Sequence, residues 1–284
     1  MRLKKRKEKG GNSLKKSGTV IGVFSAKGGT GKTTVVVNLS MALAEKMKKD
    51  VILVETNVMV SSLGVYFGIT ESPVSIYDIV SGKVKAEDAI VTYQGKLDVL
   101  PGALGFVKEF GILDMTTLIE PLRKKYSIIM LDSSPGFGAE VYAGMKACDE
   151  ILIVCQPEIP SLLGAIQTYR IADEWKIPVM AVVVNRYRGK DYEIPVPDIK
   201  KTFRGANVFV IPEDEKVPES VAKGIPVVLS APDSPAGMEF NRLARGVLAH
   251  IKSQKQVRYL KRRSAWVEEK AAPAPPPHLT KLPP

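Results

Sequence analysis

Short apolar runs alternate with longer segments of helical periodicity along most of the chain. Several runs are apolar at consecutive positions rather than at alternate ones, which is typical of strands buried on both faces of a sheet. The predicted strands lie at residues 19–25, 50–55, 97–101, 126–132, 150–156, 178–185, 207–212 and 225–230. The predicted helices lie at residues 32–48, 114–124, 138–147, 161–174, 215–223 and 234–253. Strands that alternate with helices predict an α/β fold of three layers, with a mostly parallel central sheet flanked by helices.

The positive charge of the chain is concentrated at its two ends. The 284 residues carry a formal net charge of +11, of which residues 1–18 contribute +7 and residues 251–284 contribute +6. Residues 19–250 are therefore close to neutral, at about −2. We predict four parts from these shifts in composition: a flexible basic arm at 1–18, one domain at 19–250, a basic helix with a narrow apolar stripe at 251–270, and a disordered proline-rich tail at 271–284.

The remaining composition favours a protein of the cytoplasm. The sequence has no run of about 18 apolar residues, so we expect no transmembrane helix. The basic N-terminus lacks the apolar stretch of a secretory signal. Cys148 and Cys155 lie in apolar sequence and are too few for a disulfide framework, so we predict reduced thiols in the core. The basic ends could still bring such a protein to an anionic surface.

A glycine-rich segment, KGGTGKTT at residues 27–34, lies between a predicted strand and a predicted helix. In such a loop the backbone N–H groups and the helix N-terminus point at one spot, a geometry that binds phosphate. The strict phosphate-loop pattern G-x-x-x-x-G-K-[ST] needs a glycine where Ala26 stands, so the sequence misses that pattern by one residue.

The segment resembles the deviant phosphate loop of the Min-type and partition ATPases, and the resemblance extends over residues 19–250. It implies a P-loop NTPase domain with ATP and Mg²⁺ as cofactors. In that case Lys32 neutralises the β and γ phosphates, Thr33 is a ligand of Mg²⁺, and Thr34 helps to hold the α phosphate. The loop residues expected to contact the nucleotide are Lys27, Gly28, Gly29, Thr30, Gly31, Lys32, Thr33 and Thr34.

A second lysine, Lys27, precedes the lysine that serves the phosphates. In the family that the loop resembles, this residue reaches across a nucleotide-sandwich dimer to the phosphates of the other subunit. The resemblance therefore implies an ATP-dependent homodimer, in which Lys27 belongs to the partner's nucleotide.

Two later segments extend the resemblance. YSIIMLDSSPG is similar to the second switch segment of Min-type ATPases, which implies that Asp132 holds a Mg²⁺-bound water and that the backbone of Gly136 senses the γ phosphate. VVVNRY and VFVIPED look most like archaeal Min-type ATPases. They imply that Asn185 reads the adenine edge, and that the far wall of the base site is formed by Pro212, Glu213 and Asp214. Asn185 also has an ordinary alternative role as a turn residue at a strand end.

One position departs from the family in a way that affects the chemistry. After the second strand the family has D-x-D, whereas this sequence has Glu55 and Asn57 at those two positions. An amide can orient water but cannot accept its proton, and loss of a general base typically costs about 10² to 10⁴ in rate. We therefore predict slow hydrolysis, with the alternative that Glu55 takes over by a small shift. The expected catalytic residues are Lys27, Lys32, Asn57 and Asp132.

The sequence leaves three functions open. The first is a Min-type ATPase that acts as a nucleotide-gated spatial switch at a membrane. The second is a partition-type ATPase that binds DNA non-specifically through its basic ends, and the third is a hydrolysis-deficient, nucleotide-locked scaffold. The basic helix at 251–270 fits membrane contact, a solvated surface or nucleic acid. We also expect a cargo or an activating partner protein, which the sequence does not identify.

Overall fold

The computed structural model describes residues 18–47, 50–57, 62–69, 74, 78–79, 81–102 and 115–271, and within the last helix it describes no side chain at residue 255 or at residues 258–271. Apart from Gly18, the predicted basic arm lies outside the described residues, and so does the predicted proline-rich tail beyond Ala271. The described chain forms two compact units, residues 1–244 and 245–284, of which the first contains the sheet.

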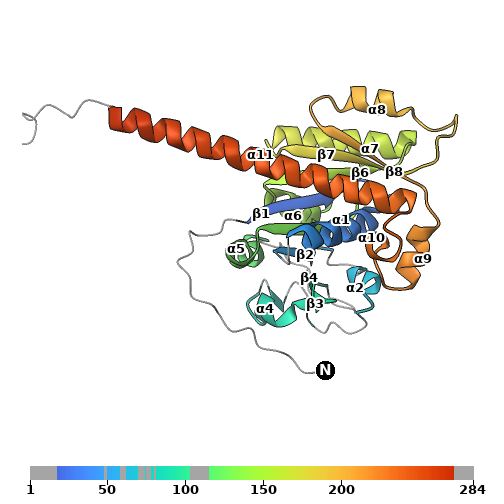
Figure 1. The fold of residues 1–284 in the computed structure, drawn as a ribbon, viewed down its shortest axis with the longest axis horizontal. Coiled ribbons are helices and arrows are strands. Elements are labelled where there is room, and N and C mark those ends of the chain that lie inside the picture. Colours follow the sequence, from blue (N-terminus) through green and yellow to red (C-terminus); the bar gives the residue numbers. More distant parts are fainter. Residues whose placement is uncertain are drawn as a thin grey trace, which may run out of the picture. The chain divides into compact units, whose positions relative to one another are not determined.

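An eight-stranded sheet organises the first unit (Figure 1). Its order is β3-β4-β2-β5-β1-β6-β7-β8, and every neighbouring pair is parallel except β3 with β4. The strands are β1 Thr19–Phe24, β2 Val51–Glu55, β3 Val91–Tyr93, β4 Leu97–Leu100, β5 Ile128–Asp132, β6 Glu150–Cys155, β7 Val179–Tyr187 and β8 Asn207–Pro212. β1 lies between β5 and β6, so the loop that follows β1 opens at the centre of the carboxyl edge, where ligands bind in parallel sheets.

Helices cover both faces of the sheet. The helices are α1 Lys32–Met47, α2 Leu63–Tyr66, α4 Ala86–Ala89, α5 Met115–Lys125, α6 Ala139–Lys146, α7 Ile159–Glu174, α8 Val196–Thr202, α9 Lys216–Ala222, α10 Val227–Ser230 and α11 Pro235–Ala271. Val20 and Phe24 of β1 belong to the apolar clusters formed with α5, α6 and α7. Because successive strand side chains point to opposite faces, the buried Ile21 and Val23 face the other layer, where α1 packs. The predicted three-layer α/β fold is confirmed.

The elements agree with the sequence pattern except at one buried run and at several short elements. The strand predicted at 225–230 is wrong, because Val227–Ser230 is the one-turn helix α10. Val227 and Val228 are buried, and the Val228 N–H donates to Asn38 Oδ1 of α1 rather than to a strand. A short apolar run cannot distinguish a buried strand from a buried turn of helix. The sequence pattern also missed β3, α2, α4 and α8. The last helix continues beyond 253 to Ala271, through the basic helix predicted at 251–270.

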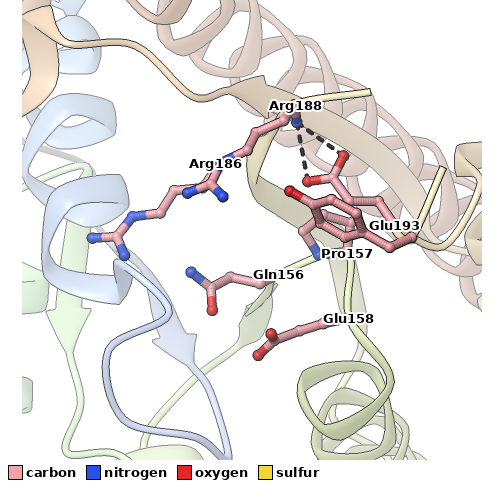
Figure 2. A pocket seen from close by; sticks show the side chains of 7 residues that line it. Gln156, Pro157, Glu158, Arg186, Arg188 and Glu193 are labelled. Atoms are coloured by element: carbon pink, nitrogen blue, oxygen red, sulfur yellow. Dashed lines mark hydrogen bonds between the residues drawn. The ribbon is translucent and has the colours of Figure 1, made fainter. Parts of the chain in front are cut away.

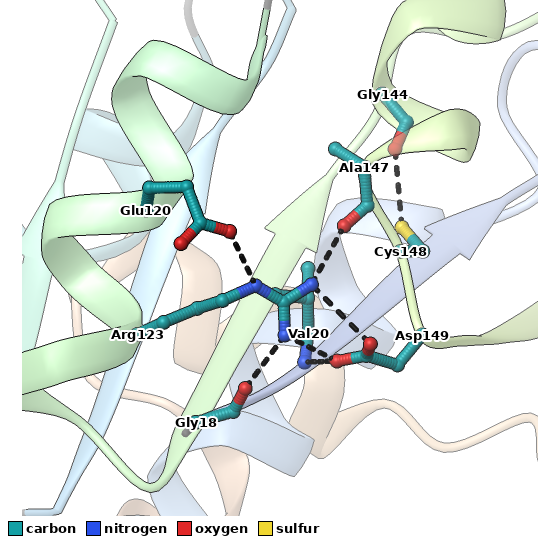
Figure 3. Close-up of polar contacts among 8 residues, drawn as sticks. All are labelled: Gly18, Val20, Glu120, Arg123, Gly144, Ala147, Cys148 and Asp149. Carbon is teal, nitrogen blue, oxygen red and sulfur yellow. Dashed lines mark hydrogen bonds and ion pairs between the residues drawn. The ribbon is translucent and has the colours of Figure 1, made fainter. Parts of the chain in front are cut away.

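A polar cluster fastens the amino ends of the central strands, at the opposite edge from the loop that follows β1 (Figure 3). The Arg123 guanidinium of α5 donates to the Gly18 carbonyl at 2.7 Å and to Asp149 Oδ2 at 2.5 Å. Asp149 also accepts the Val20 N–H at 2.8 Å. Nearby, the Cys148 thiol donates to the Gly144 carbonyl at 3.1 Å. Cys155 is fully buried in an apolar cluster, as predicted, and this burial raises the pKa of its thiol to about 12.

Candidate functional site

The loop between β1 and α1 has the backbone that a phosphate cradle requires. Gly29 and Gly31 have φ values of +77° and +87°, a region that favours glycine. A Cβ built on Gly28 or Gly29 would meet no atom within 4 Å, so this part of the loop borders open space. At Gly31 a Cβ would lie 2.1 Å from Asn185 Nδ2, so a side chain at that position would displace Asn185.

Two neighbouring segments hold the loop in place. The Gly136 N–H, from the segment after β5, donates to the Ser25 carbonyl at 3.1 Å. Asn185, at the end of β7, is 4% exposed and donates from Nδ2 to the Thr30 carbonyl at 2.8 Å. This bond uses one of the two amide hydrogens. Asn185 therefore supports the phosphate loop directly, a contact that the sequence did not reveal.

Three buried charged residues meet at the floor of the loop. Lys32 is 8% exposed, Asp132 is 1% exposed and Glu55 is fully buried. Burial lowers the pKa of Lys32, and the charges of Asp132 and Glu55 oppose that shift. Burial raises the pKa of Asp132 to about 6, while Lys32 and a hydrogen bond from the Thr33 hydroxyl act in the opposite direction.

One oxygen of Asp132 is available for a ligand. Among the described residues, Asp132 Oδ1 is buried and has no hydrogen-bond partner. A buried carboxylate oxygen without a partner is costly, and the Thr33 hydroxyl beside this carboxylate adds a second oxygen donor. Oxygen donors of this kind suit Mg²⁺, which keeps several waters and binds through one or two protein oxygens. The residues present therefore fit a Mg²⁺–phosphate group.

The raised pKa of Asp132 predicts a pH-dependent stability of the nucleotide-free protein. The folded state holds the Asp132 proton more tightly than the unfolded chain, so stability falls as the pH rises from about 4 to about 6. Above that window the buried charge destabilises the fold. We expect Asp132→Asn to raise the free energy of unfolding at pH 7.5 by about 1 to 3 kcal/mol, and to give no gain near pH 4. Urea unfolding at both pH values, without nucleotide, tests this. An Asp132→Asn variant less stable than wild type at pH 7.5 would contradict it.

Glu55 has a positioning role rather than an open carboxylate. Its Oε1 accepts the N–H groups of Ser62 and Leu63 at 2.7 and 3.2 Å, at the start of α2. Its Oε2 accepts the Gly102 N–H at 2.9 Å. Because both oxygens already accept backbone N–H groups, a shift of Glu55 to replace the Asp that is absent at position 57 is not favoured. Asn57 lies beside the segment after β5, where its Oδ1 accepts the Ser134 hydroxyl at 3.0 Å.

A cavity of about 580 Å³ adjoins the phosphate loop, within the size range of small-molecule sites. It brings together residues that the sequence predicted for the loop and for the base: Thr34, Asn185, Pro212, Glu213 and Asp214. Its other lining residues were not predicted from the sequence: Tyr66, Arg186, Val217, Pro218, Val221 and Ala222. The last four lie on α9, whose first turn follows the PED segment directly, so helical spacing after that segment could have identified them.

Asp214, one of the residues predicted to form the wall of the base site, accepts backbone hydrogen bonds that hold this wall in place. Asp214 Oδ1 accepts the Lys216 N–H, and Oδ2 accepts the Ala236 N–H, both at 2.9 Å. Burial acts to raise the pKa of Asp214, but these bonds and one from Ser234 together lower it. Asp214 therefore fixes the starts of α9 and α11 and shapes the cavity.

Lys27 lies apart from the buried lysine. Its Nζ is 2.5 Å from Glu158 Oε1, just before α7, and both side chains are nearly half exposed. Figure 2 shows Glu158 and Gln156 facing Arg186 and Arg188 across a second cavity of about 130 Å³. Within the chain, Lys27 is paired with an acid, whereas Lys32 occupies the floor of the loop.

The fold and the loop define a nucleotide-binding P-loop domain, and comparisons with known proteins identify its family. The family described as an AAA domain matches residues 18–177. An uncharacterised ATP-binding protein of Methanocaldococcus jannaschii is 30% identical over 245 residues, covering 83% of this chain and 92% of that protein. The septum site-determining protein MinD of Thermotoga maritima is 30% identical over 244 residues, covering 81% and 88%.

The solved structures agree with the sequence comparisons. The septum site-determining protein MinD complexed with Mg-ADP from Pyrococcus horikoshii is 31% identical, with a TM-score of 0.77. The match covers 82% of this chain and 98% of that one. The chain therefore belongs to the MinD/ParA family of P-loop ATPases.

Proposed function

We propose that this chain binds Mg-ATP, forms a nucleotide-sandwich dimer and acts as a spatial-positioning switch with slow hydrolysis. The observation that carries the proposal is the separation of its two lysines. Lys32 is buried beside Asp132, whereas Lys27 is 46% exposed at its side chain and pairs with Glu158. This separation supports the proposal, because a half-exposed lysine next to a phosphate cradle would be able to reach the nucleotide of a second copy.

Different residues of the chain would contact the metal ion, the phosphates and the base. Bound Mg²⁺ neutralises phosphate charge and orders the oxygens around it. Thr33 and Asp132 would hold it and its water, while Lys32 compensates the charge of the β and γ phosphates. The backbone around Gly28 and Gly29, which borders open space, would wrap the phosphate chain with its N–H groups. The cavity lined by Asn185 and Pro212 would take the base.

Slow hydrolysis follows from Asn57. In this position a carboxylate could accept a proton from the attacking water, whereas an amide can only orient that water. The Ser134 hydroxyl already fixes the amide at 3.0 Å, so Asn57 is positioned but not basic. A dimer that closes on ATP would therefore reopen slowly, and its lifetime would depend on an activating partner. If turnover is absent altogether, the chain is a nucleotide-locked scaffold.

The basic ends supply the surface contact. The region 251–270 lies within α11 and carries seven Lys or Arg residues against two acids. Each basic residue near an anionic bilayer contributes about 1 kcal/mol, so several together support peripheral binding. Among the described helices, none is long and apolar enough to cross a bilayer. Non-specific DNA binding through the same charges is the alternative, and it would be strongly salt-dependent.

A vesicle-flotation assay paired with a DNA gel shift distinguishes membrane binding from DNA binding. We expect the wild-type protein to float with vesicles of mixed neutral and anionic lipids in ATP, and to float less in ADP. A gel shift with duplex DNA, run at the same salt concentration with each nucleotide, is the matched arm. ATP-dependent DNA binding with no flotation would replace the membrane assignment by the partition-type one. Retention by neither surface in ATP would contradict the proposed switch.

A further inference from the structure

Tyr66 brings a hydroxyl to the phosphate loop from a separate segment. It ends the short helix α2, and its Oη lies 2.9 Å from Thr34 Oγ1, near the start of α1. Both residues line the 580 Å³ cavity, together with Asn185 and Pro212. Tyr66 thus stands where the phosphate end of the cradle meets the base end of the cavity.

The fold does not depend on the Tyr66 hydroxyl to hold α2. The start of that helix is fixed by Glu55, which accepts the Ser62 and Leu63 N–H groups. Its end is fixed by Phe67, which is 5% exposed and packs against Tyr93 with the two rings tilted and their centroids 4.7 Å apart. Because these contacts hold α2, the hydrogen bond between the Tyr66 and Thr34 hydroxyls is not needed for the position of the helix. A stronger acceptor can therefore replace it.

The paired hydroxyls of Tyr66 and Thr34 could both donate to an anionic oxygen. Two hydroxyls that pair with each other use one donor and leave the other donor unused in that bond. A phosphate oxygen beside the pair, within hydrogen-bond reach of both hydroxyls, would accept from both, and hydrogen bonds to a charged acceptor are stronger than those between neutral groups. Burial raises the pKa of Tyr66, with the bond from Thr34 acting against that shift, so the hydroxyl keeps its proton at neutral pH.

We propose that Tyr66 is a nucleotide-positioning residue, whose hydroxyl donates to an α-phosphate oxygen that Thr34 also binds. The inference rests on the proposed nucleotide function and adds a residue from α2 to the site. Because α2 is fastened to Glu55 at the end of β2, the contact would tie the α phosphate to the strand that leads to Asn57.

Nucleotide affinities of Tyr66→Phe test the proposal. Dissociation constants for Mg-ADP, AMP and adenosine are measured in competition with a fluorescent ADP analogue. We expect ADP and AMP to bind about tenfold more weakly to the variant, as for a lost hydrogen bond to a charged group, and adenosine to bind as it does to wild type. The matched control is Tyr93→Phe, which removes a hydroxyl that donates to the Gly224 carbonyl outside the cavity lining. We expect this variant to keep the wild-type affinities.

The outcomes separate the inference from the function on which it rests. If wild type binds no ADP, the proposed nucleotide function is wrong and the inference falls with it. If wild type binds ADP and Tyr66→Phe binds it equally well, only the inference is overturned. An equal loss for adenosine also overturns it, because the hydroxyl would then act on the nucleoside or on the shape of the cavity. Thermal unfolding without nucleotide should give the same midpoint for wild type and Tyr66→Phe within about 2 °C.

Discussion

Replacing Asn57 by Asp is expected to raise the rate of ATP hydrolysis by about 10² to 10⁴, the usual contribution of a positioned general base. The site accepts the change without rearrangement, because a carboxylate oxygen can take the hydrogen bond that the Ser134 hydroxyl now gives to Asn57 Oδ1 at 3.0 Å. Glu55 does not supply the missing carboxylate, since both of its oxygens accept backbone N–H groups. The new group would restore a proton acceptor next to the segment that follows Asp132.

Phosphate release under single-turnover conditions measures this effect. Asn57→Ala is the matched control, because it removes the amide without adding a base, and we expect it to be no faster than wild type. Mg-ADP affinity should be similar in all three proteins, since Asn57 does not line the base cavity. An Asn57→Asp variant that hydrolyses ATP no faster than its parent would show that position 57 does not limit the reaction.

Replacing Lys27 by Ala is expected to abolish the proposed ATP-dependent dimer. A two-fold dimer would contain two equivalent Lys27–phosphate contacts, and each hydrogen bond to a charged group contributes about 1.5 to 3 kcal/mol. Their loss would weaken the dimer by about 10² to 10⁴ in dissociation constant. Lys27 lies outside the buried cluster of Lys32 and Asp132, so nucleotide binding by the monomer should survive.

Glu158→Gln provides the matched comparison for Lys27. The substitution keeps the size of the side chain and removes the charge that holds Lys27 Nζ at 2.5 Å. Because both side chains are nearly half exposed, the ion pair is weak and its loss should not unfold the protein. A released Lys27 is free to meet a partner's phosphates, so we expect this variant to dimerise in ATP at least as readily as wild type.

Most of the sheet could be predicted from the sequence because its strands are nearly continuous apolar runs. The phosphate loop could be predicted because its residues are adjacent in the chain, between one strand and one helix. The failures share a different cause. Tyr66 meets Thr34 across 32 positions, and Glu158 meets Lys27 across 131. No local pattern encodes such contacts, since they depend on which strand ends the topology brings together.

Glu55 at the end of β2 and Asp214 just after β8 illustrate the same limit. Spacing relative to the family placed Glu55 near the reaction and Asp214 at the base. The structure shows that both carboxylates accept backbone N–H groups, at the start of α2 for Glu55 and at the starts of α9 and α11 for Asp214. A sequence indicates that an acid ends or follows a strand, but not whether its oxygens already accept hydrogen bonds from the backbone.

The molar mass of the protein in ATP, compared with that in ADP, tests the nucleotide-gated dimer most directly. Size-exclusion chromatography with light scattering should give twice the chain mass of 31.0 kDa for wild type in Mg-ATP and the single mass in Mg-ADP. Lys27→Ala should remain at the single mass in both nucleotides, while Glu158→Gln should dimerise in ATP. A wild-type protein that binds Mg-ATP and remains a monomer would contradict the sandwich dimer and the role given to Lys27.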